Sequence, residues 1–521
     1  MGRSPLRVQT SSIRLASVIV LGVIAGYGGA AASAAPATPV AVDPEGFLRI
    51  AYAGTVNSLD PHMTTTPVYS SYQFAIYDRL FQLDYDENIE PMLAESFEFS
   101  ADGASLTLHL RDDVVFHDGS PVDAPAVKAS LERGQTVDGS TVATSLAGIA
   151  GVEVVDDHTV VLRLDGVGAE IPALLATSAG SVLNPAVFDD PAVDLGAAPP
   201  PAAGSGPYVV TESEPGVATS YERAPEYWNE STGLMSGYTI TYIPAGATRL
   251  AGLRAGDFDL AQITADVFVE AEGYADAGEF SMISTVATTR DLMLNIEGGD
   301  LADPEVRDAI ALAIDREEFA LVQPCEPITQ PLRDWHWAYN PEIQWEHDPE
   351  RAREIIDARG GAAFEIAFQA GGAYEAIATV VQAQLADVGI QVELRPREPS
   401  ELFPNLGSGE LQAVLSGVTP GPDPVDVINR FFLGGANLAR GAAADELRAI
   451  IGPGSDPALT QEERAEIYRV GWQYIADQVL YVPICGAPVG WAATTEIINL
   501  DVMPLTTKAV PDFSVLGVAA S

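Results

Sequence analysis

Patterns typical of helices and of strands alternate along most of this chain, and no other feature limits its possible folds so strongly. In residues 303–314, Asp303 followed by proline predicts a helix start, and apolar residues then recur on one face. The helix pattern of residues 377–388 ends at Gly389, and residues 390–394 follow directly as an apolar strand. This alternation predicts α/β lobes built on mainly parallel sheets.

Further strands are predicted in the first half of the chain. Residues 47–52 are apolar enough for a buried strand, and residues 106–110 and 238–242 alternate as half-exposed strands. Residues 152–155 and 159–164 predict a hairpin. Strand segments are therefore spread over the whole chain, and a sheet has to join segments that are far apart in sequence.

A capping box predicts one more helix near the C-terminus. Thr460 and Glu463 have the spacing with which two side chains bond the backbone at a helix start. Four apolar residues are expected on the inward side of this helix: Ile467, Val470, Tyr474 and Ile475. The proline-rich residues 197–203 carry neither pattern and are expected to form a linker.

The chain is strongly acidic. Its 521 residues include 73 Asp and Glu against 27 Lys and Arg, a formal net charge of −46. Such a surface repels the phosphates of nucleic acid, so we expect no nucleic-acid partner. Apolar residues make up 47% of the chain, which excludes wholesale disorder, and the length predicts about three domains.

Residues 1–34 have the order of regions found in a secretory signal peptide. Three arginines precede an apolar stretch, residues 15–32, and the small residues 32–34 offer a cleavage site. Cleavage there predicts an exported protein, periplasmic or extracellular and associated with the cell envelope. Retention of the segment as a membrane anchor is the alternative.

Catalytic and metal-binding motifs are missing from the sequence. Six histidines are scattered without the spacing of metal ligands, and neither a G-x-S-x-G elbow nor a P-loop occurs. We therefore expect no metal, no cofactor and no catalytic residue. The two cysteines, Cys325 and Cys485, can form a disulfide in an exported protein, and two buried thiols are the alternative.

Several segments together resemble the extracellular solute-binding proteins, family 5, of ABC importers, which include the dipeptide, oligopeptide and nickel binders. Their number and order make the resemblance specific, and it runs from about residue 47 to residue 500. The segments are residues 58–61, 90–96, 106–133, 204–208, 222–228, 253–259, 294–295 and 306–319.

The resemblance implies a bilobal periplasmic-binding-protein-like fold, with two α/β lobes, a hinge and an inserted subdomain. Lobe I would combine residues 47–84, 205–296 and 497–521, with residues 85–204 inserted in it, and lobe II would be residues 297–496. The hinge crossings would lie near Asn295 and Asn499.

The resemblance also implies a function. Such a protein captures a peptide-like or other small solute in the cleft between its lobes and delivers it, as a monomer, to the transmembrane permease subunits and ATPases of an ABC importer. It performs no chemistry on the solute. The alternatives are a secreted hydrolase with an unmarked acidic pair and a ligand-sensing receptor that is not coupled to transport.

The cleft would be lined by the loop after the first strand, the segment that enters the hinge, and loops of lobe II. The expected ligand contacts are His62, Met63, Tyr69, Arg290, Trp335, Trp337, Gly417, Thr419 and Asp423. Arg290 would pair with a ligand carboxylate or phosphate. The alternatives are core packing for the two tryptophans, a loop role for His62 and a salt bridge from Arg290 to Asp291.

One segment departs from the peptide-binding members of the family. Residues 416–424 have the sequence SGVTPGPDP, where those members carry an aspartate that meets the free amine of the peptide. Aligned on Asp423, that aspartate falls at Pro420, which supplies no anion. Capture of an ordinary free-amine peptide is therefore in doubt, and a modified peptide, an oligosaccharide, an opine-like compound or another metabolite stays open.

Overall fold

The computed structural model describes residues 41–63, 67–84, 87–166, 168–188, 190, 192–197, 199–370, 373–503 and 510–520. The predicted signal peptide lies outside these residues. Within the described part of the chain, no helix is long and apolar enough to cross a membrane.

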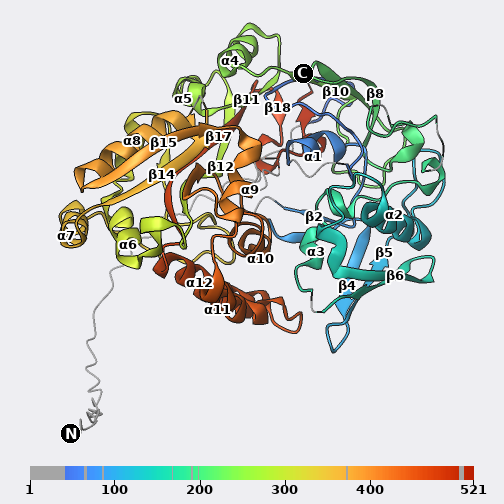
Figure 1. Ribbon diagram of the computed structural model, residues 1–521. Coiled ribbons are helices and arrows are strands. Elements are labelled where there is room, and N and C mark those ends of the chain that lie inside the picture. The colour runs from blue at the N-terminus through green and yellow to red at the C-terminus, as the bar shows by residue number, and fades with distance from the viewer. Residues whose placement is uncertain are drawn as a thin grey trace, which may run out of the picture. The chain divides into compact units, whose positions relative to one another are not determined.

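One large mixed sheet runs through the described structure (Figure 1). It joins strands from both ends of the chain, as the scattered strand patterns predicted. In spatial order its strands are β15 (Ile390–Arg397), β14 (Ala362–Gln369), β16 (Ala413–Ser416), β12 (Ser281–Leu294), β17 (Tyr481–Ala493), β11 (Leu260–Ile263), β1 (Phe47–Tyr52), β10 (Gly237–Tyr242), β9 (Ala218–Arg223) and β8 (Tyr208–Glu214), with β13 (Glu326–Pro327) beside β17.

The expectation of mainly parallel sheets was wrong. Strand β1 is parallel to β10 and β11, and β14 is parallel to β15 and β16. The other described pairings of this sheet are antiparallel, and the longest of them joins β12 to β17. Alternation of helix and strand patterns does not reveal strand direction when a strand pairs with a segment nearly 200 residues away, as here.

A smaller antiparallel sheet is formed by strands within residues 94–164. Its strands are β4 (Ala94–Phe99), β5 (Ser105–Leu110), β7 (Thr159–Leu164) and β6 (Ile149–Asp156), in that order. Helix α2 (Ala124–Thr136) packs beside β6 and β7. The predicted hairpin is confirmed, because β6 and β7 pair across the turn at residues 157–158. Two further pairs are β2 (Phe81–Leu83) with β3 (Ile89–Pro91), and β18 (Ile497–Ile498) with β19 (Gly517–Val518).

The helix ends agree with the capping signals in the sequence. The Asp303 side chain accepts a hydrogen bond from the backbone of Glu305, and Gly389 adopts a positive φ of 89° after the third predicted helix pattern. The remaining helices are α1 (Pro67–Gln73), α3 (Ile171–Leu174), α4 (Gly246–Ala255), α5 (Phe268–Asp276), α6 (Pro304–Ala313), α7 (Pro349–Arg359), α8 (Ala373–Asp387), α9 (Pro399–Ser408), α10 (Pro424–Val427), α11 (Gly441–Ile451) and α12 (Gln461–Asp477).

The predicted inward face of α12 was partly wrong, although its capping box is present. Ile475 is buried as expected, but Val470 is 56% exposed. Tyr468 and Trp472 are buried instead, and Arg464 lies on the same side, where it binds a buried carboxylate. A search for a periodic pattern of apolar residues does not recognise this face of the helix, because a charged residue lies on it.

The predicted linker at residues 197–203 was also wrong in part. Ala203 is fully buried and belongs to a hydrophobic core. The next residue, Gly204, lies so close to the carbonyl oxygen of Ile76 that a Cβ would collide with it. The glycines of the Gly204–Tyr208 segment are therefore required for close packing against residues 75–76 rather than for flexibility.

The buried apolar residues fall into three groups along the chain. The first core contains residues within 48–77, 183–271 and 491–516. The middle core contains residues within 80–182. The second core contains residues within 292–485.

Strands β12 and β17 belong to both the first and the second core. On β12, Ile283 packs against the first core and Leu292 lies in the second. On β17, Ile484 lies in the second core and Trp491 in the first. The β12–β17 register shifts twice in between, between Val286 and Thr288 and between Arg290 and Asp291. Both strands thus run without a break from one core to the other, and the pairing between them is irregular in the segment where they pass between the cores.

Cys325 and Cys485 form a disulfide in the structure, with their Cα atoms 5.6 Å apart. Cys485 lies on β17, at the edge of the irregular segment, and Cys325 immediately precedes β13. The bridge closes a loop of 160 residues and fastens β13 to one of the two shared strands.

Replacing both cysteines by serine is expected to lower the free energy of unfolding by about 2–4 kcal/mol, because the unfolded chain loses a long covalent loop. Denaturant unfolding of the variant and the parent measures this difference. Alkylation of the denatured, unreduced parent is expected to label neither cysteine, and labelling of two thiols would contradict the pairing.

Candidate functional site

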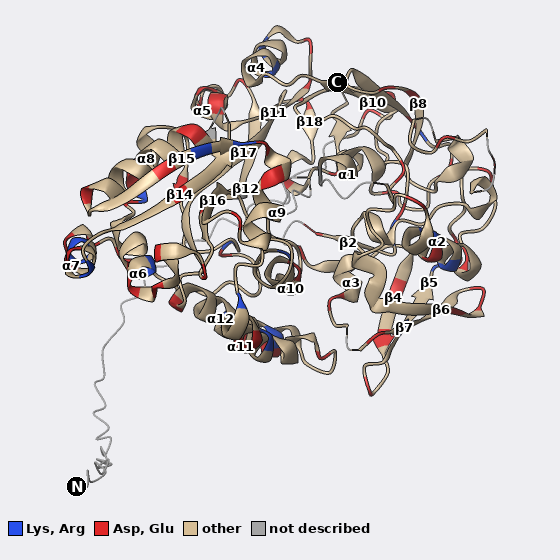
Figure 2. Cartoon of the chain, in the orientation of Figure 1, with Lys and Arg blue, Asp and Glu red and all other residues tan. Residues whose placement is uncertain are grey.

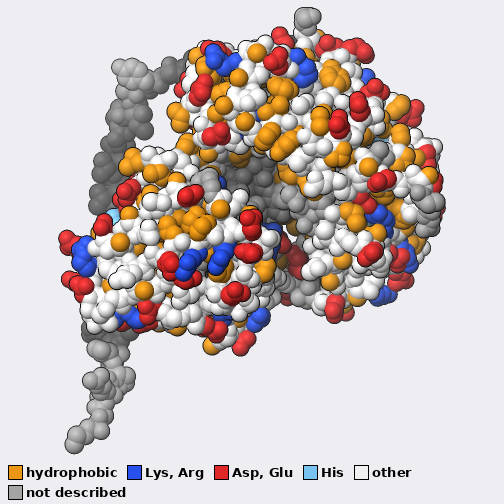
Figure 3. Space-filling view, turned by 45° about the horizontal axis from the view of Figure 1, so that its top comes forward, with side chains coloured by type: hydrophobic (Ala, Val, Ile, Leu, Met, Phe, Trp, Pro, Cys, Tyr) orange, Lys and Arg blue, Asp and Glu red, His pale blue; other side chains and the backbone are white. Residues whose placement is uncertain are grey.

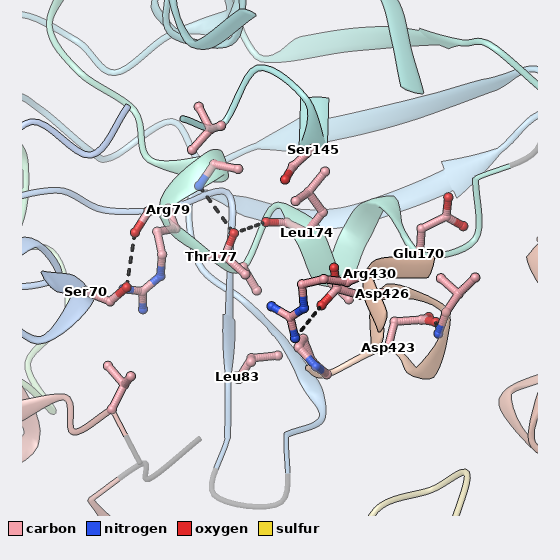
Figure 4. Close-up of a pocket in the computed structure, with 18 of the residues that line it drawn as sticks. Ser70, Arg79, Leu83, Ser145, Glu170, Leu174, Thr177, Asp423, Asp426 and Arg430 are labelled. Carbon is pink, nitrogen blue, oxygen red and sulfur yellow. Dashed lines mark hydrogen bonds and ion pairs between the residues drawn. The ribbon is translucent and has the colours of Figure 1, made fainter. Parts of the chain in front are cut away.

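A cavity of about 380 Å³ opens where stretches from all three cores meet (Figure 4). Residues within 70–83 and 142–179 line one part of it, and residues within 422–430 line another. Val510 and Asp512, from near the C-terminus, also reach it. The cavity is thus enclosed by segments that are up to 440 residues apart.

Hydroxyl groups line one part of this cavity. The Ser70 and Ser178 hydroxyl oxygens lie 3.2 Å apart, and the Ser178 hydroxyl donates to the side chain of Gln73. Thr177 donates its hydroxyl to the carbonyl oxygen of Leu174 at the end of α3. Ser70 lies on α1, so α1 and the turn after α3 together present a polar surface to the cavity.

Helix α10 supplies the opposite part of the lining, which carries several charges. Asp423 caps the helix by accepting a hydrogen bond from the backbone of Val425 at 3.1 Å. Its other oxygen accepts a hydrogen bond from the buried Arg464 at 2.5 Å, so its charge is compensated behind the cavity. Arg430 lies 3.6 Å from Asp426 and donates to the carbonyl oxygen of Thr419 at 2.5 Å.

Glu170 completes the acidic side of the lining. Burial raises the pKa of its carboxyl group to about 6, and the nearby Asp423 carboxylate adds to that effect. The backbone N–H of the preceding residue, Ala169, donates to the carbonyl oxygen of Ser455 at 3.3 Å. This bond directly joins the middle-core stretch to the second-core stretch next to the cavity.

Arg79 is the other cation of the lining. Its guanidinium carbon lies 3.4 Å from the centre of the Phe74 ring, and Nη2 lies 3.9 Å from Asp512. The preceding residue, Asp78, accepts hydrogen bonds from Tyr227, Trp228 and Ser205. Because Asp78 is held from three sides, the backbone that carries Arg79 into the cavity is firmly positioned.

The loop that carries α10 is tied to the shared strand β12. The Asp291 carboxylate accepts hydrogen bonds from the Thr289 hydroxyl and from the backbone of Val418, the latter at 3.1 Å. Asp291 is fully buried, and this desolvation raises the pKa of its carboxyl group to about 7. The irregular segment of β12 and the cavity wall are therefore connected through one titratable group.

Of the predicted ligand contacts, Asp423 lines the cavity and the others do not. Trp337 is one residue removed from it, because its indole N–H donates to the carbonyl oxygen of Pro422, which does line the cavity. The same indole stacks on His336 and meets Tyr468 edge-on. Trp337 therefore supports the cavity wall by packing.

The predicted contacts from the loop after β1 lie in the protein interior or at its edge. His62 is fully buried, and its Nδ1 lies 2.8 Å from Arg133 within the Arg133–Asp60 ion pair. Burial lowers the pKa of His62 to about 4, so the ring is neutral at neutral pH. Met63 and Tyr69 are half-buried, and Tyr69 packs against the first core.

The remaining predicted contacts lie around the β12 segment and the loop before α10. Arg290 lies 4.6 Å from the ring centre of Tyr374 and donates to the carbonyl oxygen of Thr289. Trp335, Gly417 and Thr419 are half-buried and do not reach the cavity lining with their side chains.

Sequence reasoning missed most of the lining residues. Those that bring polar chemistry are Ser70, Arg79, Thr177, Ser178, Glu170, Asp426, Asn429, Arg430 and Asp512. One signal was available: Asp78 and Arg79 interrupt an otherwise apolar run, residues 74–81, and charges in such a run need partners or a role. The other residues carry no local signal, because serine, threonine and acidic residues are common throughout this chain.

Four acidic residues line the cavity: Glu170, Asp423, Asp426 and Asp512. Acidic residues also lie on helices and loops throughout the described chain (Figure 2), and acidic side chains are scattered over the face shown in Figure 3. The acidity is thus a general property of the surface. The charge of the cavity therefore depends on the individual partners of each charged residue that lines it.

Comparison with known proteins agrees with this architecture. The family model of bacterial extracellular solute-binding proteins, family 5 (middle region), matches residues 88–439. The chain belongs to this family of solute-binding proteins.

Curated relatives and solved structures extend the comparison. The glutathione-binding protein GsiB of Salmonella paratyphi A is 27% identical over 320 residues, which are 60% of this chain and 61% of the relative. The chain thus spans about 61% of the length of this relative. The periplasmic binding protein DppA from Helicobacter pylori, solved with the peptide STSA, is 22% identical, with a TM-score of 0.74 and coverage of 91% of this chain and 98% of that one.

A second solved structure is similar to the same degree. NikA from Brucella suis, solved with Fe(III)-EDTA, is 23% identical, with a TM-score of 0.75 and coverage of 87% of this chain and 96% of that one. These likenesses confirm the predicted bilobal periplasmic-binding-protein fold.

The Asp291→Asn variant is expected to lose a specific pH dependence of stability. In the parent, native Asp291 holds its proton up to about pH 7, whereas the unfolded chain releases it near pH 4. The native state binds more protons between these values, so the free energy of unfolding falls as pH rises through this window, by up to about 4 kcal/mol.

Denaturant unfolding at pH 4.5, 6 and 8 measures this trend in both proteins. The asparagine variant should show a shallower fall than the parent, since the amide does not ionise. Parallel curves for the two proteins would show that Asp291 does not titrate in this window.

Proposed function

We propose that this protein is exported, binds a small solute in the cavity between two lobes and delivers it to the permease subunits and ATPases of an ABC importer. One observation carries the proposal: the cavity is lined on one side by residues from the stretches of chain that carry the first and middle cores, and on the other by residues from the stretch that carries the second core. A site divided in this way is completed only when the lobes come together, which is how ligand binding favours a closed state.

The division into lobes follows the cores. Lobe I corresponds to the first core, the inserted subdomain to the middle core and lobe II to the second core. This supports an inserted subdomain of about residues 80–182, somewhat shorter than residues 85–204. The irregular segments of β12 and β17 are the proposed hinge, at about residues 286–291 and 483–488.

The hinge assignment has a physical basis in the two strands. Bulges interrupt the regular ladder and let a strand bend without breaking its neighbours' hydrogen bonds. Gly486 lies on β17 in the same segment and Gly490 just beyond it, and a Cβ at either position would collide with β12. The strands can therefore stay closely packed while the angle between the lobes changes.

For the solute we propose only a broad chemical class. The relatives' names mention glutathione, a peptide and Fe(III)-EDTA, so membership of the family leaves a range of small solutes. A peptide-like solute fits a cavity of about 380 Å³. The family comprises solute-binding proteins, and we propose that the solute leaves this protein chemically unchanged and that the protein acts as a monomer.

Native mass spectrometry of protein purified from its own host tests this function. A co-purified small molecule of fixed mass is expected, and the same molecule should raise the melting temperature of the emptied protein without being converted. Accumulation of a product from that molecule would replace the proposal by the hydrolase alternative. A genomic neighbour with transmembrane helices and a P-loop ATPase would favour an importer over a sensor.

A designed disulfide tests whether closure controls access to the cavity. The backbones of Ala169 and Ser455 are hydrogen-bonded at 3.3 Å, so the pair Ala169→Cys and Ser455→Cys is expected to lock the lobes when oxidised. The locked protein should exchange bound solute at least tenfold more slowly than the reduced one, measured by dilution and native mass spectrometry.

Each single-cysteine variant is the control, since it cannot lock. Mild reduction should restore exchange, because the new bridge is half-exposed whereas Cys325 and Cys485 are buried. Equal exchange in the oxidised and reduced forms would exclude lobe closure as the gate.

A further inference from the structure

We propose that Arg79 forms an anion-binding subsite in this cavity and that the solute carries an oxyanion, a carboxylate or a phosphate, that accepts hydrogen bonds from its guanidinium group. The inference rests on the proposed solute binding and adds to it the chemistry of the solute and the residue that recognises it.

Arg79 lies in the interior and on the cavity at the same time. It is 3% exposed, and it lines the cavity together with Ser70 (Figure 4). Asp512 belongs to the same lining. Its guanidinium group stacks on Phe74, with the carbon 3.4 Å from the ring centre, which fixes the plane of the group. A planar cation held in this way is oriented in advance for an anion.

The hydrogen-bonding capacity of Arg79 is largely unused. Among the described residues, neither Nε nor Nη1 has a hydrogen-bond partner. Nη2 lies 3.9 Å from Asp512, which is too far for a hydrogen bond. The adjacent Asp78 is occupied by Tyr227, Trp228 and Ser205.

Two other buried arginines, Arg249 and Arg464, differ from Arg79 in the hydrogen bonds of their side-chain nitrogens. Arg249 donates from Nε, Nη1 and Nη2 to the oxygens of residues 262, 243, 244 and 264. Arg464 donates from Nε to a carbonyl oxygen and from Nη2 to Asp423. Arg249 and Arg464 thus have acceptors for these nitrogens, and Arg316, which lacks one for Nη2, still donates from Nε and Nη1. Arg79, on the cavity, lacks acceptors for both Nε and Nη1 among the described residues.

An unpaired buried donor is costly, and a charged donor more so. Burial lowers the pKa of Arg79, but a guanidinium group stays protonated at neutral pH. A ligand oxyanion that enters the cavity would supply the missing acceptor and replace the long contact with Asp512 by a charge-assisted hydrogen bond.

Neighbouring groups fit an anion of low charge. The hydroxyls of Ser70, Thr177 and Ser178 line the same cavity, and each can turn its single O–H to an oxygen of the ligand by giving up the internal hydrogen bond that it makes in the structure. Asp512 is itself held by the backbone and hydroxyl of Ser514, so it stays close to Arg79 and disfavours a ligand with several negative charges there.

Calorimetric titration of matched probes tests the subsite. The probes are alanyl-leucine, its C-terminal amide, glutathione and inorganic phosphate, and the proteins are the parent, Arg79→Met and Arg79→Lys. The parent should bind alanyl-leucine or glutathione at least tenfold more tightly than the amide, or bind phosphate. A preference for the carboxylate over its amide identifies a carboxylate as the oxyanion, and binding of inorganic phosphate identifies a phosphate. Either result supports the subsite.

The Arg79→Met variant should lose this preference, and Arg79→Lys should keep part of it, because lysine retains the charge without the planar group. The control is Arg395→Met, which removes a half-buried arginine of β15 that is paired with Glu365 of β14 and Glu393 of β15, and this variant should bind like the parent. The melting temperature of empty Arg79→Met should not fall below that of the parent, since the variant removes unpaired buried donors.

Three results would overturn the subsite. The first is that the parent binds alanyl-leucine and its amide equally well and does not bind phosphate. The second is that Arg79→Met keeps the preference for the acid over the amide. The third is that Arg79→Met melts at a lower temperature than the parent while its binding is unchanged. A neutral solute co-purified from the host would also overturn it while leaving solute binding intact, so the two proposals fail separately.

Discussion

The antiparallel pairing of β12 with β17 is the constraint on which the rest of the structure depends. Both strands contribute side chains to the first and to the second core, so the packing of both cores involves the same two strands. Their ladder is irregular only where the cores change, between Val286 and Asp291. A continuous pair of strands with a local irregularity keeps two separately packed bodies attached and still lets the angle between them vary, because the bending is confined to a few residues.

Buried charges connect this pair of strands to the cavity. Asp291 holds the backbone of Val418, and a few residues later Asp423 is bound by Arg464 of α12. Such groups are expensive to bury unless they are bonded, so each pair specifies one arrangement of the loop before α10. The wall of the cavity is therefore positioned by polar contacts, while the lobes behind it are held by apolar packing. Arg79 differs from these pairs, because neither its Nε nor its Nη1 has a partner among the described residues, and it lines the cavity.

Local signals in the sequence predicted local structure well. The N-cap at Asp303, the stop at Gly389 and the capping box at Thr460 are all present, because each depends on groups within four residues. Strand direction and the inward face of α12 were predicted wrongly, since both depend on distant partners. Arg464 faces inward only because Asp423 is there to receive it.

The sequence by itself determined the family, the order of the helices and strands, and the general acidity of the chain. Only the tertiary structure decided which polar groups meet. Arg79, Thr177 and Asp426 line one cavity although long stretches of chain separate them, and apart from the charged pair at residues 78–79 their neighbours in sequence give no hint of it. The physical reason is that a local pattern encodes burial and backbone conformation, whereas the meeting of three distant side chains depends on how whole cores pack against shared strands.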